Sequence, residues 1–479
     1  MIFNSLQFLY FFIIVTSLYF VLPQKYKWLL LLLASCYFYM AFVPIYILIL
    51  GFTIVVDYCA GILIAKSIGK KRKFFLVCSL VANIGVLAVF KYYNFLNHNL
   101  SVLLGGMGYT NRIPYLSILL PIGLSFHTFQ AMSYTIEVYR GNYPPEKNFG
   151  IYALYVMFYP QLVAGPIERP QNILYQFYEK HRFNIADVTD GLKLMAWGFF
   201  KKVVISDRLA QPVNEVYNNP HHYQGMPLVL ATVFFAFQIY CDFSGYSDIA
   251  IGAAKVMGFD LMKNFNRPYS ARSIAEFWQR WHISLSTWFR DYLYIPLGGN
   301  RVKVSRRYLN LMITFLISGL WHGANWTYVF WGGLNGLYLI IEIATRSVRG
   351  RIRSVTTAFS AGLYNMVCLL VTFVLICTTW VFFRAKNLND GIYILTHWTK
   401  PSLGGTRSLI ADNNIDILFA LSGLLILLAV EYFQKDGSFT EYINKKPPVL
   451  RWGFYYGLLL IIFALGKFEG NQQFIYFQF

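Results

Sequence analysis

Two histidines lie in the two most unusual polar contexts of this chain. His322 interrupts an apolar stretch, within Ser318-Gly-Leu-Trp-His-Gly-Ala-Asn-Trp326, and His282 lies in a polar and aromatic segment that runs from Glu276 to Arg301. An ionisable side chain between hydrophobic segments is costly to place in lipid, so it indicates a functional site. A neutral imidazole in apolar surroundings suits a general base that takes a proton from a hydroxyl and returns it. A structural histidine, hydrogen-bonded between helices, is the alternative interpretation of His322.

Polar side chains are also dense around His282, over residues 276–291 of a chain that carries few charges. The tryptophans and tyrosines of this segment are typical of anchors at the membrane surface. An interfacial histidine is therefore the alternative interpretation of His282. A second polar group, on the apolar run that starts near residue 226, is expected to face a cavity. We expect the following side chains to bind substrate or to line a passage: Trp281, Ser284, Trp288, Arg290, Asp291, Tyr292, Trp321, Asn325, Asp242 and Ser244.

Several other kinds of site lack support in the motifs. The chain has neither a His-x-Glu pair nor a His-Glu-x-x-His motif, so we predict no metal site. Its six cysteines show no CxxC spacing, which argues against a disulfide framework. A glycine-rich phosphate loop and a Gly-x-Ser-x-Gly elbow are both missing, which argues against a nucleotide hydrolase and an α/β-hydrolase. We also expect no bound cofactor.

The composition is that of a membrane protein. Of the 479 residues, 57% are hydrophobic, 19% are aromatic and 13% are charged, and the mean hydropathy is +0.46. A soluble protein carries about 25% charged residues. Apolar runs of membrane-spanning length recur from end to end, which predicts one integral membrane domain over residues 1–479. The net charge of +19 resides in short loops between these runs, a positive-inside pattern that argues against a nucleic-acid partner.

The apolar runs predict an all-α polytopic fold. Several runs are short or broken by proline or glycine, so we expect about 11 crossings plus re-entrant or interfacial helices. The first run lacks the basic region and cleavage site of a signal peptide, so it is expected to be a transmembrane helix. The basic loops, taken as cytoplasmic, put both termini outside. The candidate spans are 3–22, 29–42, 45–65, 74–90, 115–138, 151–164, 191–206, 226–256, 308–320, 326–345, 361–383, 414–434 and 452–467.

This topology gives the two histidines different depths. Residues 257–307, which include His282, fall on the cytoplasmic side and are too polar to span lipid, so a re-entrant or membrane-surface element is expected. His322 lies 14 residues after Tyr308, near which its helix is expected to start. At 1.5 Å per residue this is a depth of ~21 Å in a hydrocarbon layer ~30 Å thick. We therefore expect His322 beyond the midplane, seen from the cytoplasm.

The chain resembles the membrane-bound O-acyltransferase family, and within it the bacterial branch typified by alginate O-acetylation. The resemblance extends over nearly the whole chain. The runs Trp-His-Ile-Ser-Leu-Ser-Thr-Trp-Phe-Arg-Asp-Tyr and Leu-Trp-His-Gly-Ala are specific in combination. The stretches that carry it are Pro121–Gln130, Tyr159–Arg169, Gln238–Gly252, Asn266–Tyr269, Phe277–Arg301, Ser318–Trp326 and Trp380–Ala385.

The resemblance implies a helical fold around a central tunnel, with a catalytic core over about residues 115–345. It matches His322 to the family's catalytic histidine and His282 to the second motif position, nearer the cytoplasmic opening. It implies that an acyl group, acetyl by this branch, passes from a cytoplasmic thioester such as acetyl-CoA to an extracytoplasmic polysaccharide. It further implies residence in the bacterial inner membrane, among its lipids, and a periplasmic or extracellular acyltransferase or acceptor protein as partner.

Three alternatives remain open at this point. A protein similar to the D-alanyl transfer protein of teichoic acid modification would take its acyl group from a carrier-protein thioester. A transporter would use broken helices and a polar site at the midplane, and internal inverted repeats, which we do not see, would favour it. A scaffold would only recruit a periplasmic enzyme, and it would function without His322.

Overall fold

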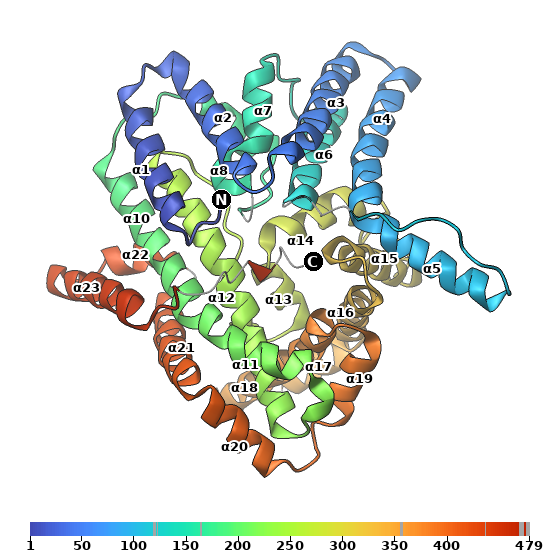
Figure 1. The fold of residues 1–479 in the computed structure, drawn as a ribbon, viewed down its shortest axis with the longest axis vertical. Coiled ribbons are helices and arrows are strands. Elements are labelled where there is room, and N and C mark those ends of the chain that lie inside the picture. Colours follow the sequence, from blue (N-terminus) through green and yellow to red (C-terminus); the bar gives the residue numbers. More distant parts are fainter. Residues whose placement is uncertain are drawn as a thin grey trace. The chain divides into compact units, whose positions relative to one another are not determined.

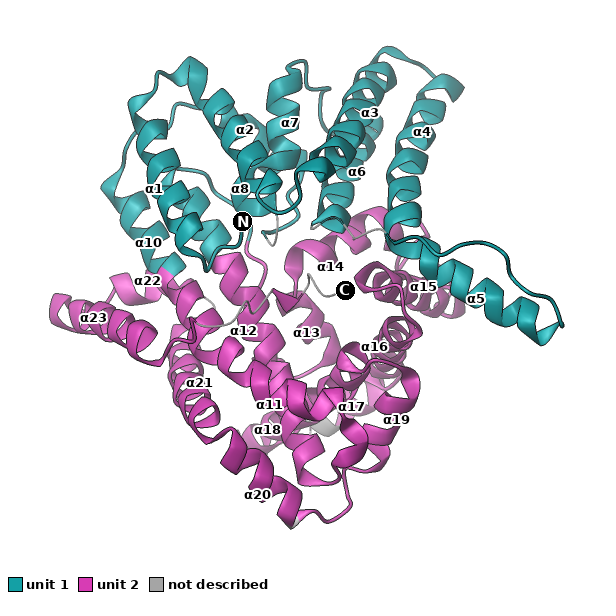
Figure 2. Cartoon of the chain, in the orientation of Figure 1, with its two compact units in different colours: residues 1–195, 249–262 teal, residues 196–248, 263–479 magenta. Residues whose placement is uncertain are grey.

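The computed structural model describes residues 1–117, 121, 123–162, 165–354, 358–435, 437–468 and 474–475. Within this part of the chain every regular element is a helix (Figure 1). The chain divides into two compact units, one formed by residues 1–195 and 249–262 and the other by residues 196–248 and 263–479 (Figure 2). Two of the three divisions fall within the helices α10 (Ile185–Phe199) and α12 (Met226–Val256), and the third follows Met262.

In unit 1, a buried polar cluster joins three helices that pack against one another. Asp57 on α3 accepts hydrogen bonds from Ser79 Oγ at 2.5 Å and from Asn83 Nδ2 at 2.9 Å, both on α4, and Ser79 also donates to Thr135 on α6 at 3.0 Å. Polar contacts of this kind hold helices together where water is excluded. The α-helices of this unit, besides parts of α10 and α12, are α1 (Leu6–Val21), α2 (Gln24–Met40), α3 (Ile47–Lys66), α4 (Lys70–Leu87), α5 (Tyr93–Gly106), α6 (Leu124–Arg140), α7 (Phe149–Met157), α8 (Tyr159–Leu162) and α9 (Pro170–Ile173).

A second buried carboxyl group in unit 1 lies in the loop before α9. Glu168 accepts hydrogen bonds from the Met262 amide at 2.6 Å and from Asn172 Nδ2 at 3.1 Å. Burial raises the pKa of this carboxyl group to about 7, because desolvation outweighs the stabilising hydrogen bonds. The loop is thereby fixed to the short segment that leaves α12.

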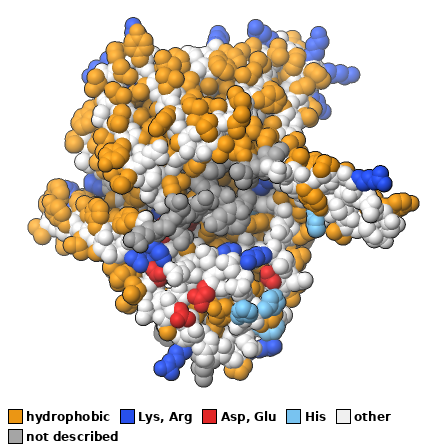
Figure 3. Space-filling model, viewed as in Figure 1, with side chains coloured by type: hydrophobic (Ala, Val, Ile, Leu, Met, Phe, Trp, Pro, Cys, Tyr) orange, Lys and Arg blue, Asp and Glu red, His pale blue; other side chains and the backbone are white. Residues whose placement is uncertain are grey.

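Many apolar side chains of the helices are exposed, as expected of surfaces that face lipid. Figure 3 shows such side chains over much of the visible surface of α1 to α4. This identifies a multi-pass membrane protein, while the expected number of about 11 crossings stays a prediction. Six helical stretches within the described residues are long and apolar enough to cross a membrane, namely Pro44–Lys66, Lys70–Gly106, Met226–Val256, Ser360–Arg384, Asn414–Gln434 and Pro448–Leu465.

Unit 2 has an aromatic core. Trp281 packs against Trp380, with ring centroids 4.9 Å apart, and Trp380 stacks on Trp331 at 6.0 Å. Besides parts of α10 and α12, its helices are α11 (Asp207–Asn218), α13 (Ile274–Arg280), α14 (Ile283–Phe289), α15 (Val304–His322), α16 (Trp326–Ala344), α17 (Arg346–Ser354), α18 (Ala358–Arg384), α19 (Leu388–Thr396), α20 (Leu403–Asp412), α21 (Asn414–Gln434), α22 (Phe439–Asn444) and α23 (Pro448–Leu465).

The structure differs from the sequence-based expectation in three places. Of the helix expected over residues 115–138, residues 118–120 and 122 lie outside the described part of the chain, and the described helix begins at Leu124, as α6. Residues 93–106 continue as the helix α5, and the chain that returns beside α5 is held by side-chain amides, since Asn94 donates to the Leu116 carbonyl and Asn97 to the Ile113 carbonyl. Trp281 is only 1% exposed, so it is a core residue and not an anchor at the membrane surface. Its burial follows from aromatic partners on distant helices, which local sequence does not reveal.

Candidate active site

His282 lies at the sharp turn between two short helices of unit 2. It lies after α13, which ends at Arg280, and directly before α14, which begins at Ile283. Its backbone is left-handed (φ 42°, ψ 55°), and the residue is fully buried. Its ring meets the edge of Phe243 at 4.6 Å between centroids and stacks on Phe265 at 6.5 Å. Burial lowers the pKa of the imidazole from 6.5 to about 3. The side chain is therefore neutral at ordinary pH.

His322 is the last residue of α15, and it is also buried, at 4% exposure. Its ring packs against Trp331 at 4.9 Å and against Phe383 at 5.4 Å. The histidine thus faces the aromatic core of unit 2 and not the lipid. It lies about 27 Å along the helix axis from Val304, the first residue of α15, at 1.5 Å per residue.

Glycines bring α15 unusually close to α16 beside His322. A Cβ atom on Gly319 would lie 2.2 Å from the Tyr328 carbonyl oxygen, and one on Gly332 would lie 2.2 Å from that of Phe315. Small residues let the backbones of membrane helices approach in this way. The turn between the helices ends at Asn325, whose side chain caps α16 by accepting from the Thr327 amide at 3.0 Å. The hairpin fixes His322 at its tip.

Trp321 lies beside both histidines. Its ring centroid is 6.3 Å from that of His282 and 5.0 Å from that of His322. The side chain is 4% exposed, so this contact lies within the core of unit 2. The two segments that the sequence singled out separately are therefore neighbours in space, joined through one indole ring.

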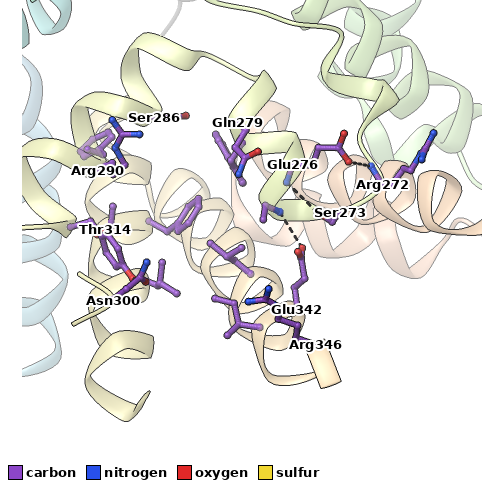
Figure 4. A pocket seen from close by; sticks show the side chains of 18 of the residues that line it. Arg272, Ser273, Glu276, Gln279, Ser286, Arg290, Asn300, Thr314, Glu342 and Arg346 are labelled. Atoms are coloured by element: carbon purple, nitrogen blue, oxygen red, sulfur yellow. Dashed lines mark hydrogen bonds between the residues drawn. The ribbon is translucent and has the colours of Figure 1, made fainter. Parts of the chain in front are cut away.

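The same elements form the wall of a cavity of about 1130 Å³ (Figure 4). Ile283, which follows His282, and Ser318, which precedes His322 by four residues, both line this cavity. Glu342 on α16 reaches toward α13 and accepts from the Ala275 amide at 3.1 Å. The charged side chains of the lining are five arginines and two glutamates, namely Arg272, Arg290, Arg307, Arg346, Arg349, Glu276 and Glu342. The cavity can accordingly attract an anionic ligand.

Known proteins match this chain over the region that builds the cavity. The sequence profile of the membrane-bound O-acyltransferase family matches residues 148–383. A probable alginate O-acetylase of Pseudomonas aeruginosa is 40% identical over 392 residues, which cover 81% of this chain and 73% of that protein. The chain belongs to the membrane-bound O-acyltransferase family. The matched region contains both histidines and every residue that lines the arginine-rich cavity.

Two further relatives show the range of acyl groups in this O-acyltransferase family. A peptidoglycan O-acetyltransferase of Helicobacter pylori is 34% identical over 428 residues, which cover 82% of this chain and 79% of that protein. A teichoic acid D-alanyltransferase of Streptococcus thermophilus is 30% identical over 241 residues, which cover 48% of this chain and 58% of that protein. This chain is thus a membrane-bound acyltransferase.

The residues predicted to bind substrate are spread over the cavity wall, an aromatic contact beside it and the buried interior of this O-acyltransferase. Arg290 lines the cavity and pairs with Asp291 at 2.8 Å between Nε and Oδ1, while Tyr292 packs on Trp288 at 5.1 Å between ring centroids. Ser284 is buried and hydrogen-bonded within unit 2. Whether these side chains contact substrate stays a prediction.

Asp242 and Ser244 lie in the buried part of α12. Asp242 Oδ1 is 2.6 Å from Lys202 Nζ, which is also 2.8 Å from Asp207 Oδ1. The other Asp242 oxygen accepts from the Ile475 amide at 2.7 Å. Both oxygens of this carboxylate thus have partners within unit 2, an arrangement that is typical of a structural ion pair.

Sequence reasoning missed four of the arginines that line the cavity, namely Arg272, Arg307, Arg346 and Arg349. Arg307, Arg346 and Arg349 belong to basic loops that served only to predict the topology, and Arg272 lies in no such loop. The spacing of the four arginines in the sequence gives no sign that they converge. Within the described residues no group of three or more His, Cys, Asp and Glu side chains is arranged to hold a metal ion.

Proposed function

We propose that this acyltransferase moves an acetyl group from cytoplasmic acetyl-CoA to a hydroxyl of an extracytoplasmic polysaccharide. The observation that carries the proposal is the arginine-rich cavity, whose wall includes the neighbours of both histidines. Coenzyme A carries a diphosphate and a separate phosphate, and arginine is the side chain best suited to phosphate recognition. Five arginines against two glutamates leave an excess of positive charge to meet these groups. Two relatives are named as a probable alginate O-acetylase and a peptidoglycan O-acetyltransferase, which supports an acetyl group as the cargo and a glycan as the acceptor.

The proposed chemistry is a direct transfer at His322. The neutral imidazole takes the proton of the acceptor hydroxyl while the hydroxyl oxygen attacks the thioester carbonyl carbon. The tetrahedral intermediate collapses, the carbon–sulfur bond breaks, and the thiolate recovers the proton from His322. Thioester and alcohol are thereby converted to ester and thiol with no net gain or loss of protons. His282, with Arg290, Asp291 and Tyr292, holds the donor or lines its path.

The experiment is a thiol-release assay with the full chain in proteoliposomes, supplied with acetyl-CoA and a soluble oligosaccharide acceptor. His322→Ala should lower the rate about 1,000-fold, since general-base catalysis contributes ~10²–10⁴. His98→Ala, at an exposed histidine on α5, is the matched control and should behave as wild type. Equal thiol release by wild type and His322→Ala would refute the proposed role of His322, and sugar flux without thiol release would favour a transporter.

The donor is tested by substrate competition in the same assay. Acetyl-CoA should outcompete 3′-dephospho-CoA thioester, because the second lacks one of the phosphates that the arginines are proposed to bind. A carrier-protein thioester, with only one phosphodiester on its pantetheine arm, should be a poorer donor. Preference for the carrier-bound thioester would instead support the chemistry named for the D-alanyltransferase relative.

The proposed setting is the bacterial inner membrane, with the basic loops in the cytoplasm and both termini outside. A periplasmic or extracellular acyltransferase or acceptor protein is the proposed partner, and it delivers the acceptor hydroxyl to His322. Cysteine labelling from each side of the membrane tests the orientation. A cysteine introduced in the basic loop at 66–73 should react with a membrane-impermeant thiol reagent only from the cytoplasmic side.

A further inference from the structure

The turn that carries His282 is held by a second segment of unit 2, residues 264–266. The Ile283 amide donates to the Asn264 carbonyl at 2.9 Å, and the Asn266 amide donates to the Arg280 carbonyl at 2.9 Å. These two backbone hydrogen bonds lie on either side of His282 in the sequence. The left-handed backbone of His282 is uncommon for a residue other than glycine, and it persists only where the surroundings enforce it.

The side chain of Asn264 strengthens this clamp. Its Oδ1 accepts from Ser284 Oγ at 2.7 Å and from the Ser284 amide at 3.4 Å, and its Nδ2 donates to Ser247 Oγ on α12 at 3.2 Å. Asn264 is only 1% exposed, so these bonds are shielded from water. A buried amide with both ends engaged specifies one geometry for the groups it joins.

The bond to the Ser284 amide has a particular meaning for α14. His282 occupies the N-cap position of this helix, and its side chain makes no capping hydrogen bond. An N-cap side chain ordinarily accepts from the second or third amide of its helix. Here Asn264, from a different segment, accepts from the second amide, that of Ser284. Asn264 thus caps α14 from a neighbouring segment, and the imidazole of His282 is directed toward Phe243 and Trp321.

We propose that Asn264 is the positioning residue of His282: it caps α14 in place of the histidine and keeps the imidazole beside Trp321 and the site of acyl transfer. This inference rests on the proposed function, since it assumes that His282 serves the reaction. Asn264 is not among the residues that line the cavity, and its side chain is not assigned a contact with the reacting groups. Its loss should therefore change the geometry of catalysis and leave donor binding in the arginine-rich cavity intact.

The test compares Asn264→Ala, Asn264→Asp and His282→Ala in the thiol-release assay with acetyl-CoA, using the full chain in proteoliposomes. Asn264→Ala should lower kcat about 30-fold or more with KM for acetyl-CoA unchanged. A displaced His282 misaligns the thioester, and a misplacement of ~1 Å can cost ~10²-fold, whereas the arginines proposed to bind the phosphates of the donor stay in place. Asn264→Asp keeps an oxygen that accepts from Ser284, and it should recover at least a third of wild-type kcat. Asn335→Ala is the control, a buried asparagine that donates only within α16, to the Trp331 carbonyl.

Each outcome separates this inference from the proposed function. If His282→Ala is inactive while Asn264→Ala stays within threefold of Asn335→Ala, the positioning role is wrong and the proposed function stands. If His282→Ala retains wild-type kcat and KM, the proposed role of His282 fails, and the inference fails with it. Should Asn264→Ala not fold, Ser284→Ala removes only the 2.7 Å bond, and a kcat lowered about threefold to tenfold at unchanged KM supports the clamp. An unchanged kcat would overturn it.

Discussion

The close approach of α15 and α16 makes a quantitative prediction about Gly319. A Cβ atom there would lie 2.2 Å from the Tyr328 carbonyl oxygen, whereas ordinary contact begins at 3.4 Å. Gly319→Ala must therefore separate the two backbones by about 1.2 Å, and neither partner is a flexible side chain that could move aside. His322 is three residues further along the same helix, so it moves with α15. A displacement of ~1 Å at a reacting group can cost ~10²-fold in rate, or about 2.7 kcal/mol of transition-state stabilisation.

The hairpin offers a matched control in Gly333. A Cβ atom at Gly333 would meet only the side chain of Leu316, at 3.5 Å. Gly333→Ala should leave thiol release unchanged and stabilise the helix by up to ~1 kcal/mol, since alanine is the better helix former. Gly319→Ala should lower the unfolding free energy by about 1–3 kcal/mol, as overpacking usually does. Thermal unfolding in detergent measures the stability, and thiol release from acetyl-CoA measures the rate. If the two variants differ by less than threefold in rate at equal folded amounts, helix approach does not position His322.

Three other changes test separate parts of the molecule. Because the raised pKa of Glu168 makes the folded protein bind a proton that the unfolded chain releases between pH 4.5 and about 7, stability should fall as the pH rises through this range. Glu168→Gln should flatten that part of the unfolding-temperature profile, and parallel profiles would contradict the assignment. Arg346→Gln and Arg349→Gln should each raise KM for acetyl-CoA about tenfold with kcat retained, whereas a fall in kcat alone would count against phosphate binding. Asp242→Asn should cost about 1.5–3 kcal/mol of stability, the usual cost of a hydrogen bond to a charged group, because Lys202 keeps its pair with Asp207; a well-folded but inactive variant would assign Asp242 to the substrate instead.

The sequence was most informative where chemistry and local structure coincide. Apolar runs predicted separate spans over 308–320 and 326–345 on either side of His322, and the structure ends α15 at His322 and begins α16 at Trp326. Helical periodicity and helix-breaking residues act within a few positions, so they can be recognised without the fold. The family could likewise be inferred, because its motifs are continuous runs of residues.

Contacts between distant segments were not predictable in this way. Lys202 and Asp242 are separated by 40 residues and form a pair at 2.6 Å, and Asn264 caps a helix that starts 19 residues later, at Ile283. Local sequence does not distinguish a basic residue of a cytoplasmic loop from one that lines a cavity. Arg346, for example, lines the cavity. These features depend on how helices pack, which local propensity does not determine.

The paired charges of unit 2 have a consequence for how the protein is made. Lys201 and Lys202 pair with Asp248 and Asp242 on α12, each at 2.6 Å. An unpaired aspartate at the centre of a transmembrane helix costs about 2.5–3.5 kcal/mol during insertion. The lysines precede α12 in the chain, so during synthesis each cation is available before the carboxylate that needs it. Integration of α12 into the bilayer is therefore expected to depend on a segment that the ribosome has already delivered.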